Sequence, residues 1–242
     1  MTRALIAGLF GALASIASAQ AADPARSWPP PMEATYEKPT PKFQELLSGW
    51  YIRGDLGYRW NKLGTFDAPA PVTSQSYGNG IAATFGAGHK IDWFRADVTI
   101  DRGWRTSYSG TTAAAGATQP QYTAKIDALS VMVNGYIDFG SWSGFTPYVG
   151  AGVGMTRLKS TQYRDSAFVG AAGPEGEAQN FSWAWMAGVA YQIQPNWVID
   201  MSFRHLDMGD FPSTTGTNPT VGGMFKNVTA QEARIGIRFL FD

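Results

Sequence analysis

The 242-residue sequence predicts an all-β protein, an eight-stranded antiparallel up-and-down transmembrane β-barrel with a disordered N-terminal arm. Three observations predict this fold. Apolar and polar residues alternate in eight segments, and the connections between these segments are alternately long and short. After the N-terminal region, no stretch offers the roughly 18 continuous apolar residues that a spanning helix needs. A chain of this kind can cross a membrane only as a closed barrel.

The N-terminal region predicts export. Residues 1–21 are typical of a signal peptide, with Arg3, an apolar run from Ala4 to Ile16 and a small-residue cleavage site at Ala19-Gln20-Ala21. The apolar run is too short for a membrane anchor, which is the alternative interpretation. Residues 22–48 contain six prolines and no apolar period, so we expect a Pro-rich periplasmic arm. Residues 49–242 remain for the outer-membrane β-barrel.

The first predicted strand, residues 49–61, shows the pattern that the others repeat. Trp50, Leu56 and Trp60 fall on one face with other apolar residues, and charged residues fall on the opposite face. Aromatic residues at both ends of an apolar face are typical of the girdles of membrane barrels. The other seven strands are predicted at residues 81–90, 94–104, 128–138, 147–157, 183–192, 197–206 and 231–241.

The connections alternate strictly in length. The long connections are residues 61–80, 105–125, 158–181 and 207–229, and the short ones are residues 89–93, 139–145 and 193–196. Short periplasmic turns, long external loops and an even number of strands are typical of bacterial outer-membrane barrels.

Four stretches carry a family resemblance: Gly49 to Tyr58, Phe94 to Val98, Thr146 to Gly154, and Phe203 to Gly209. With them, residues 45–242 resemble the OmpA-type eight-stranded outer-membrane β-barrels, in particular the small surface-antigen porin-like family. The resemblance implies location in the Gram-negative outer membrane, among outer-membrane lipid and lipopolysaccharide, after insertion by the barrel-assembly machinery. The family usually ends on an aromatic residue, whereas here Asp242 follows Phe241.

Composition excludes several function classes. The chain has 19 basic and 19 acidic residues, so nucleic acid is not an expected partner. It has no cysteine and only two histidines, so we expect no disulfide, no metal site and no cofactor. The repeat Gly150-x-Gly152-x-Gly154 lacks the dinucleotide spacing, and we interpret it as small inward residues that face large ones. The oligomeric state is not predicted.

A serine esterase is the main catalytic alternative. Ser202 and His205 are three residues apart on a predicted strand, so they point to opposite faces and cannot form a nucleophile and base pair. We therefore expect no enzyme.

The inward faces predict an interior ion-pair network. Its six arginines and six acids are Arg53, Arg59, Arg95, Arg204, Arg234 and Arg238 with Asp55, Asp97, Asp101, Asp138, Asp200 and Glu232. Charges away from water must be paired, so the matched numbers predict a lumen mostly plugged by ion pairs, with Arg53 as an expected partner of Glu232. The predicted role is structural and surface-exposed. The alternatives are a weak small-solute porin and a soluble lipocalin-like periplasmic ligand-binding barrel.

Overall fold

The computed structural model describes residues 48–67, 72–112, 121–165, 176–212 and 224–241. The predicted signal peptide and all of the predicted arm before Ser48 lie outside the described residues. No helix in the described ranges is long and apolar enough to cross a membrane.

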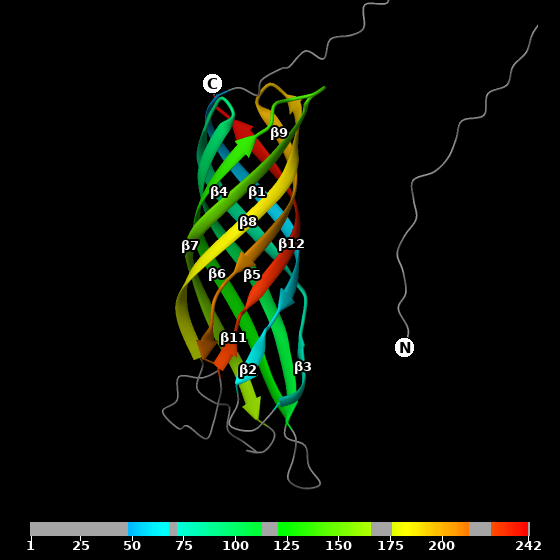
Figure 1. Cartoon of the computed structure of the whole chain (residues 1–242), viewed down its shortest axis with the longest axis vertical. Helices are drawn as coiled ribbons and strands as arrows, with labels where there is room; N and C mark the ends of the chain where they lie inside the picture. Colours follow the sequence, from blue (N-terminus) through cyan, green and yellow to red (C-terminus); the bar gives the residue numbers. More distant parts are fainter. Residues whose placement is uncertain (1–47, 68–71, 113–120, 166–175, 213–223, 242) are drawn as a thin grey trace, which may run out of the picture. The chain divides into compact units, whose positions relative to one another are not determined.

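Eight long strands form a closed antiparallel barrel, which confirms the predicted fold class (Figure 1). The strands are β1 (Gly49–Lys62), β4 (Gly80–Ile91), β5 (Phe94–Thr112), β6 (Gln121–Asp138), β7 (Phe145–Asp165), β8 (Gly176–Gln194), β9 (Trp197–Asp207) and β12 (Thr229–Leu240). Around the barrel the order is β5-β4-β1-β12-β9-β8-β7-β6, and pairing of β5 with β6 closes it. Neighbours in this ring are therefore also neighbours in the sequence, apart from β1 with β12.

Four short strands lie in regions that the sequence predicted only as long connections. They are β2 (Thr65–Asp67), β3 (Val72–Tyr77), β10 (Phe211–Pro212) and β11 (Met224–Lys226). The strand β3 pairs with the last part of β5, while β10, β11 and β2 form a separate three-stranded sheet. Figure 1 shows this small sheet at the end of the barrel opposite to the end where β12 finishes. Segments of two to six residues are too short for alternation to identify them.

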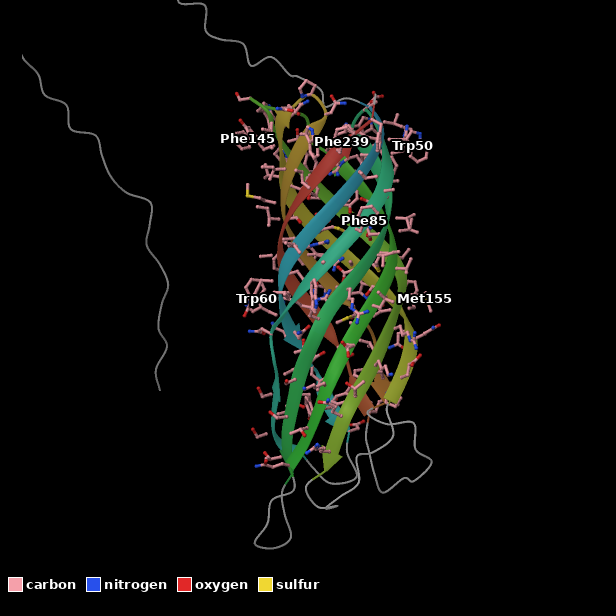
Figure 2. All side chains as sticks on the ribbon, turned by 180° about the vertical axis from the view of Figure 1, so that it is seen from behind. Trp50, Trp60, Phe85, Phe145, Met155 and Phe239 are labelled. Atoms are coloured by element: carbon pink, nitrogen blue, oxygen red, sulfur yellow. The ribbon has the colours of Figure 1, made fainter. Side chains whose placement is uncertain are left out.

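An apolar belt runs around the circumference of the barrel over one half of its length. On β1, Trp50 and Trp60 are 65% and 40% exposed, and every second residue between them also points outward. Ten residues span about 33 Å along a strand, and a tilt of about 40° reduces this to about 25 Å, the height of a membrane-embedded band. Figure 2 shows Trp50, Phe145 and Phe239 near one end of the barrel and Trp60 and Met155 near mid-length.

Four strands continue far beyond this belt. The strands β5 to β8 have 19, 18, 21 and 19 residues, whereas a membrane strand needs about 9 to 11. Past the belt the outward positions become polar, for example Ser107 and Ser109 on β5 and Thr123 on β6. The sequence prediction ended these strands at residues 104, 128, 157 and 183 because the apolar alternation stops there. The strands are continuous, but the solvent around them changes from lipid to water.

The inside of the barrel is polar where the outside is apolar. Arginines and carboxylates are buried in the lumen, and large apolar side chains are exposed on the outer wall. A soluble ligand-binding barrel has the reverse arrangement, with a polar outer surface and an apolar cavity. The lipocalin-like alternative is therefore wrong for this chain.

Inward glycines make room for these large side chains. A Cβ atom at Gly150 would lie 2.5 Å from Cδ1 of Tyr136, and one at Gly152 would collide with the Asn134 amide. The repeat that includes Gly154 is thus part of the lumen packing, in agreement with its interpretation from the sequence.

We predict that Val153→Arg prevents assembly, while Ser109→Arg is tolerated. Val153 is 53% exposed within the apolar belt, where an arginine costs about 2 to 4 kcal/mol. Ser109 points outward on β5 beyond the belt, where water solvates the new charge. The measurement is the folding yield of both variants in liposomes. Equal yields would contradict the placement of the belt.

Candidate functional site

The structure places all twelve predicted charged residues in the lumen, where none is more than 8% exposed. Each of them forms at least one ion pair with another member of the set. They come from β1, β5, β6, β9 and β12, because the alternation of each of these strands turns its charged positions inward.

Four of these residues form a closed ring of alternating charge. Arg59 donates from Nε to Glu232 Oε1 at 2.5 Å and from an Nη to Asp101 Oδ1 at 2.6 Å. Arg204 donates to the second oxygens of the same two carboxylates, both at 2.7 Å. Each carboxylate therefore binds both guanidinium groups, and the four charges neutralise one another. Charge-assisted hydrogen bonds of this kind are the strongest that side chains form.

The ring crosses the full width of the barrel. Asp101 lies on β5 and Arg204 on β9, and three strands separate them in either direction around the eight-stranded wall. Strands four positions apart in a ring of eight face each other across the lumen. The 2.7 Å contact between Arg204 and Asp101 is thus a direct link between opposite walls.

A second group of charges lies around Arg53. This arginine donates to Asp55 at 2.7 and 3.0 Å and to Asp97 at 3.2 Å. Asp97 also accepts hydrogen bonds from Asn134 at 2.7 Å and from Tyr51 at 3.1 Å. The neutral side chains of Asn134 and Tyr51 therefore satisfy the lone pairs of the Asp97 carboxylate that Arg53 does not use.

Arg234 connects the second group to the ring. Its guanidinium lies 3.3 Å from Asp55 and 3.8 Å from Glu232, and it donates to the Thr84 hydroxyl at 2.5 Å. Thr84 in turn donates to Asp101 at 2.5 Å. The two groups are thus one continuous network of ion pairs and hydrogen bonds.

The remaining pairs lie on the parts of the strands that lead to the short turns. Arg238 binds Asp200 through two nitrogens at 2.6 to 3.1 Å. Arg95 donates from Nε to Asp138 at 2.9 Å, and its guanidinium lies 4.6 Å from the ring centroids of both Tyr136 and Tyr148.

The two Nη atoms of Arg95 are buried and have no hydrogen-bond partner among the described residues. The two aromatic faces instead stabilise the charge by cation–π contact.

Sequence reasoning missed one buried cation. Lys90 is 3% exposed and its ammonium lies 3.5 Å from Asp138, which it shares with Arg95. It ends the predicted strand 81–90, which overlaps the predicted short connection 89–93, and the alternation of Gly86, Gly88 and Lys90 along β4 could have placed it inward. With Lys90, the described lumen holds seven cations and six anions.

The expected pairing of Arg53 with Glu232 is wrong. In the antiparallel register of β1 with β12, Arg59 is directly opposite Glu232, whereas Arg53 is opposite Arg238. Cross-strand neighbours are about 5 Å apart, so register decides which groups can touch. Arg53 and Glu232 are six residues out of register and bind different partners.

An apolar layer fills the lumen beyond the ring. Phe225 on β11 packs edge-on against Tyr108 of β5, with centroids 4.8 Å apart, and stacks on Phe211 of β10 at the same distance. Leu206 and Leu158 on the long strands belong to the same buried cluster. The small sheet from two long connections thus adds side chains to the barrel interior.

The catalytic alternative gains no geometric support. Ser202 shares the inward face of β9 with Arg204, while His205 points outward and stacks on Trp185, with centroids 5.9 Å apart. Within the described ranges, no three His, Cys, Asp or Glu residues lie close enough to hold a metal ion.

An antiparallel eight-stranded barrel with a lipid-facing apolar belt and a charged lumen defines the class of outer-membrane β-barrel proteins. The chain belongs to the family of the outer membrane protein beta-barrel domain, which it matches over residues 9–239. This family places it in the outer membrane and bears out the resemblance found in the sequence.

Several relatives cover most of the chain. An uncharacterised protein of Brucella suis biovar 1 is 27% identical over 82% of this chain and 78% of its own length. A putative adhesin of Rickettsia felis is 28% identical over 81% and 89%. Outer membrane protein PagN of Salmonella typhimurium is 36% identical over 32% of this chain and 33% of its own length.

Among solved structures, Neisserial surface protein A is similar in fold, with a TM-score of 0.54 and 20% identity over 80% of this chain and 98% of that one. OprG of Pseudomonas aeruginosa has a TM-score of 0.53 and 14% identity over 81% and 98%.

We predict that Arg59 and Glu232 are energetically coupled, while Arg53 and Glu232 are not. Loss of Glu232 leaves the ring arginines without a counter-charge, which costs about 3 to 5 kcal/mol. Removing Arg59 as well restores part of this loss, with a coupling of about 0.5 to 3 kcal/mol. The measurement is a double-mutant cycle on urea unfolding in lipid vesicles. Additive effects for Arg59→Ala with Glu232→Ala would contradict the ring.

Proposed function

We propose that this protein is a closed, structural and surface-exposed outer-membrane barrel, and neither an enzyme nor an open porin. The observation that carries the proposal is the ring of Arg59, Asp101, Arg204 and Glu232, which joins opposite walls of the barrel. An eight-stranded barrel is only wide enough for side chains to fill its interior. Where charged groups from facing strands are in direct contact, no continuous water path remains between them.

The apolar layer supports the same proposal. Phe211 and Phe225 are fully buried and cover the lumen on the side of the long connections. An ion passing this way would have to leave its hydration shell in an apolar environment, which is strongly unfavourable. The lumen is therefore closed by two layers of different chemistry, and opening one leaves the other in place.

The described part of the barrel also fits a surface role. The strands β5 to β8 continue beyond the lipid belt and display polar side chains there. Insertion by the barrel-assembly machinery and contact with outer-membrane lipid and lipopolysaccharide complete the proposal, and nucleic acid is not a partner. The family relatives include a putative adhesin, which is compatible with a surface role.

We predict that the native protein shows no steady conductance in planar lipid bilayers. Replacing the four ring residues by serine leaves the apolar layer closed, so it adds little conductance by itself. The same variant with Phe225→Ser removes both layers and conducts. A matched control is Lys226→Ser with Asp67→Ser, which removes an exposed ion pair of 2.5 Å on the small sheet. Large, stable conductance of the native protein would favour the porin alternative instead.

A further inference from the structure

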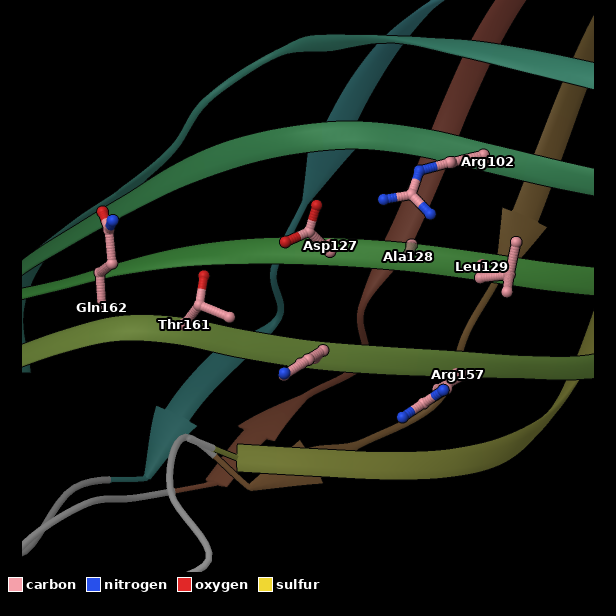
Figure 3. A pocket seen from close by; sticks show the side chains of 8 residues that line it. Arg102, Asp127, Ala128, Leu129, Arg157, Thr161 and Gln162 are labelled. Carbon is pink, nitrogen blue, oxygen red and sulfur yellow. The ribbon is translucent and has the colours of Figure 1, made fainter. Parts of the chain in front are cut away.

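A groove on the outer wall collects cations at the edge of the apolar belt. It has a volume of about 470 Å³ and lies over β5, β6 and β7. Figure 3 shows that Arg102, Asp127, Leu129 and Arg157 line it from these three adjacent strands. Lys159 also lines the groove. None of these side chains belongs to the network in the lumen.

The register fixes the spacing of the two arginines. Arg102 is opposite Leu129 on β6, and Leu129 is opposite Arg157 on β7. The two arginines therefore stand on either side of one leucine, with backbones about 10 Å apart. Lys159 follows two residues after Arg157 on the same face, next to Asp127 across the strand pair.

The groove lies at a defined height along the strands, next to the end of the apolar belt. Arg157 comes two residues after Met155, which lies level with Trp60 near the mid-length of the barrel in Figure 2. In β5, Arg102 lies between two outward apolar residues, Ile100 at 54% and the aromatic Trp104 at 46% exposed. The cations thus stand at the boundary between lipid and water on the side of the long connections, where lipid headgroups lie.

From the groove to the ends of the long strands, charge is unevenly distributed around the barrel. Among described outward positions, β5 to β8 carry five cations, Arg102, Lys125, Arg157, Lys159 and Arg164, against two anions, Asp127 and Glu177. The opposite wall carries Lys62 and Asp207, which balance. The equal numbers of basic and acidic residues in the whole chain do not reveal this patch, because it is formed by one side of the barrel wall.

One arginine of the patch already has an internal partner. Arg157 donates to Glu177 at 2.7 and 2.8 Å, and both side chains are substantially exposed. Arg102 forms no hydrogen bond or ion pair with the described residues. Its five N–H donors are available in a fork geometry that suits phosphate oxygens.

We infer that this patch, formed by Arg102, Arg157 and Lys159, binds the phosphate groups of a phosphorylated glycolipid in the outer leaflet. The acyl chains would lie along the apolar belt below the patch, where Leu129, Val131 and Ile100 are exposed. The headgroup phosphates would then reach the cations that stand directly above. Charge-assisted bonds to phosphate at a membrane surface are favourable because the apolar anchor positions the anion. This inference rests on the proposed membrane orientation but not on the closed lumen.

The test is native mass spectrometry of the folded full-length barrel released from detergent micelles, with diphosphorylated lipid A as the probe. We expect wild-type protein to bind it more tightly than the same lipid with both phosphates removed. Arg102→Gln and Lys159→Gln should each weaken binding by about tenfold, the effect of one charge-assisted hydrogen bond. Lys62→Gln, an outward lysine on the opposite wall, is the matched control and should bind as wild type does.

Three results would overturn the inference. The first is equal binding with and without the lipid phosphates, and the second is an equal loss for Lys62→Gln. The third is competition by inorganic pyrophosphate or phosphatidylglycerol at the concentration at which lipid A binds, which would assign the patch to a free anion or to anionic lipid in general. Far-ultraviolet circular dichroism checks that each variant remains folded, and conductance is independent of every outcome.

Discussion

The need to pair every charge inside a narrow barrel determines most of this structure. Burying an unpaired guanidinium or carboxylate costs several kcal/mol, and the lumen of eight strands has little space for water. The ring of Arg59, Asp101, Arg204 and Glu232 meets this need with two cations and two anions, in which each carboxylate binds both guanidinium groups. The same need explains why glycines lie opposite the largest groups. A side chain at Gly236 would displace the Asp55 carboxylate, and one at Gly103 would displace the Arg59 guanidinium.

The strands also pass through two solvents, first lipid and then water. The barrel therefore has two halves along its length, which differ in the residues they place outside and inside. In the first half, lipid selects apolar residues outside, and the interior holds charges. In the second half of β5 to β8, water selects polar residues outside, and the interior becomes apolar around Tyr108 and Phe225. This inversion occurs at the level of Trp60 and Met155. The outward cations of β5 to β7 begin at the same level, which is why a headgroup site fits there.

The faces of the strands could be predicted from sequence because period-2 alternation is a local property. Trp50 and Trp60 point outward and Arg53 and Arg59 point inward, as the first strand alone indicates. Partners inside the lumen could not be predicted in the same way, since they depend on register and on which strands face each other. The contact of Arg204 with Asp101 joins residues 103 positions apart, and no local pattern contains that information.

The sequence did not predict the parts of β5 to β8 that extend beyond the apolar belt, for a related reason. Alternation of an apolar face with a polar one identifies a strand in lipid, but Ser107 and Ser109 give no such contrast with their surroundings in water. Inward positions there include apolar residues such as Tyr108 and Ile126, so the pattern no longer has the phase that it has in the belt. Lys90 was missed at a strand end, where the predicted strand and the predicted short connection overlap.

Access of water to the level of the ring is the most direct test of a closed lumen. The chain has no cysteine, so a single one can be introduced as a specific probe. Ser130 is opposite Asp101 in register, fully buried, and accepts a hydrogen bond from Thr156 at 2.8 Å. In vesicles, Ser130→Cys should stay unmodified by a small charged thiol reagent until the protein is unfolded, whereas Ser107→Cys on the outer face of β5 should react at once. Equally rapid modification at both positions would show that water reaches the ring and would contradict the closed lumen.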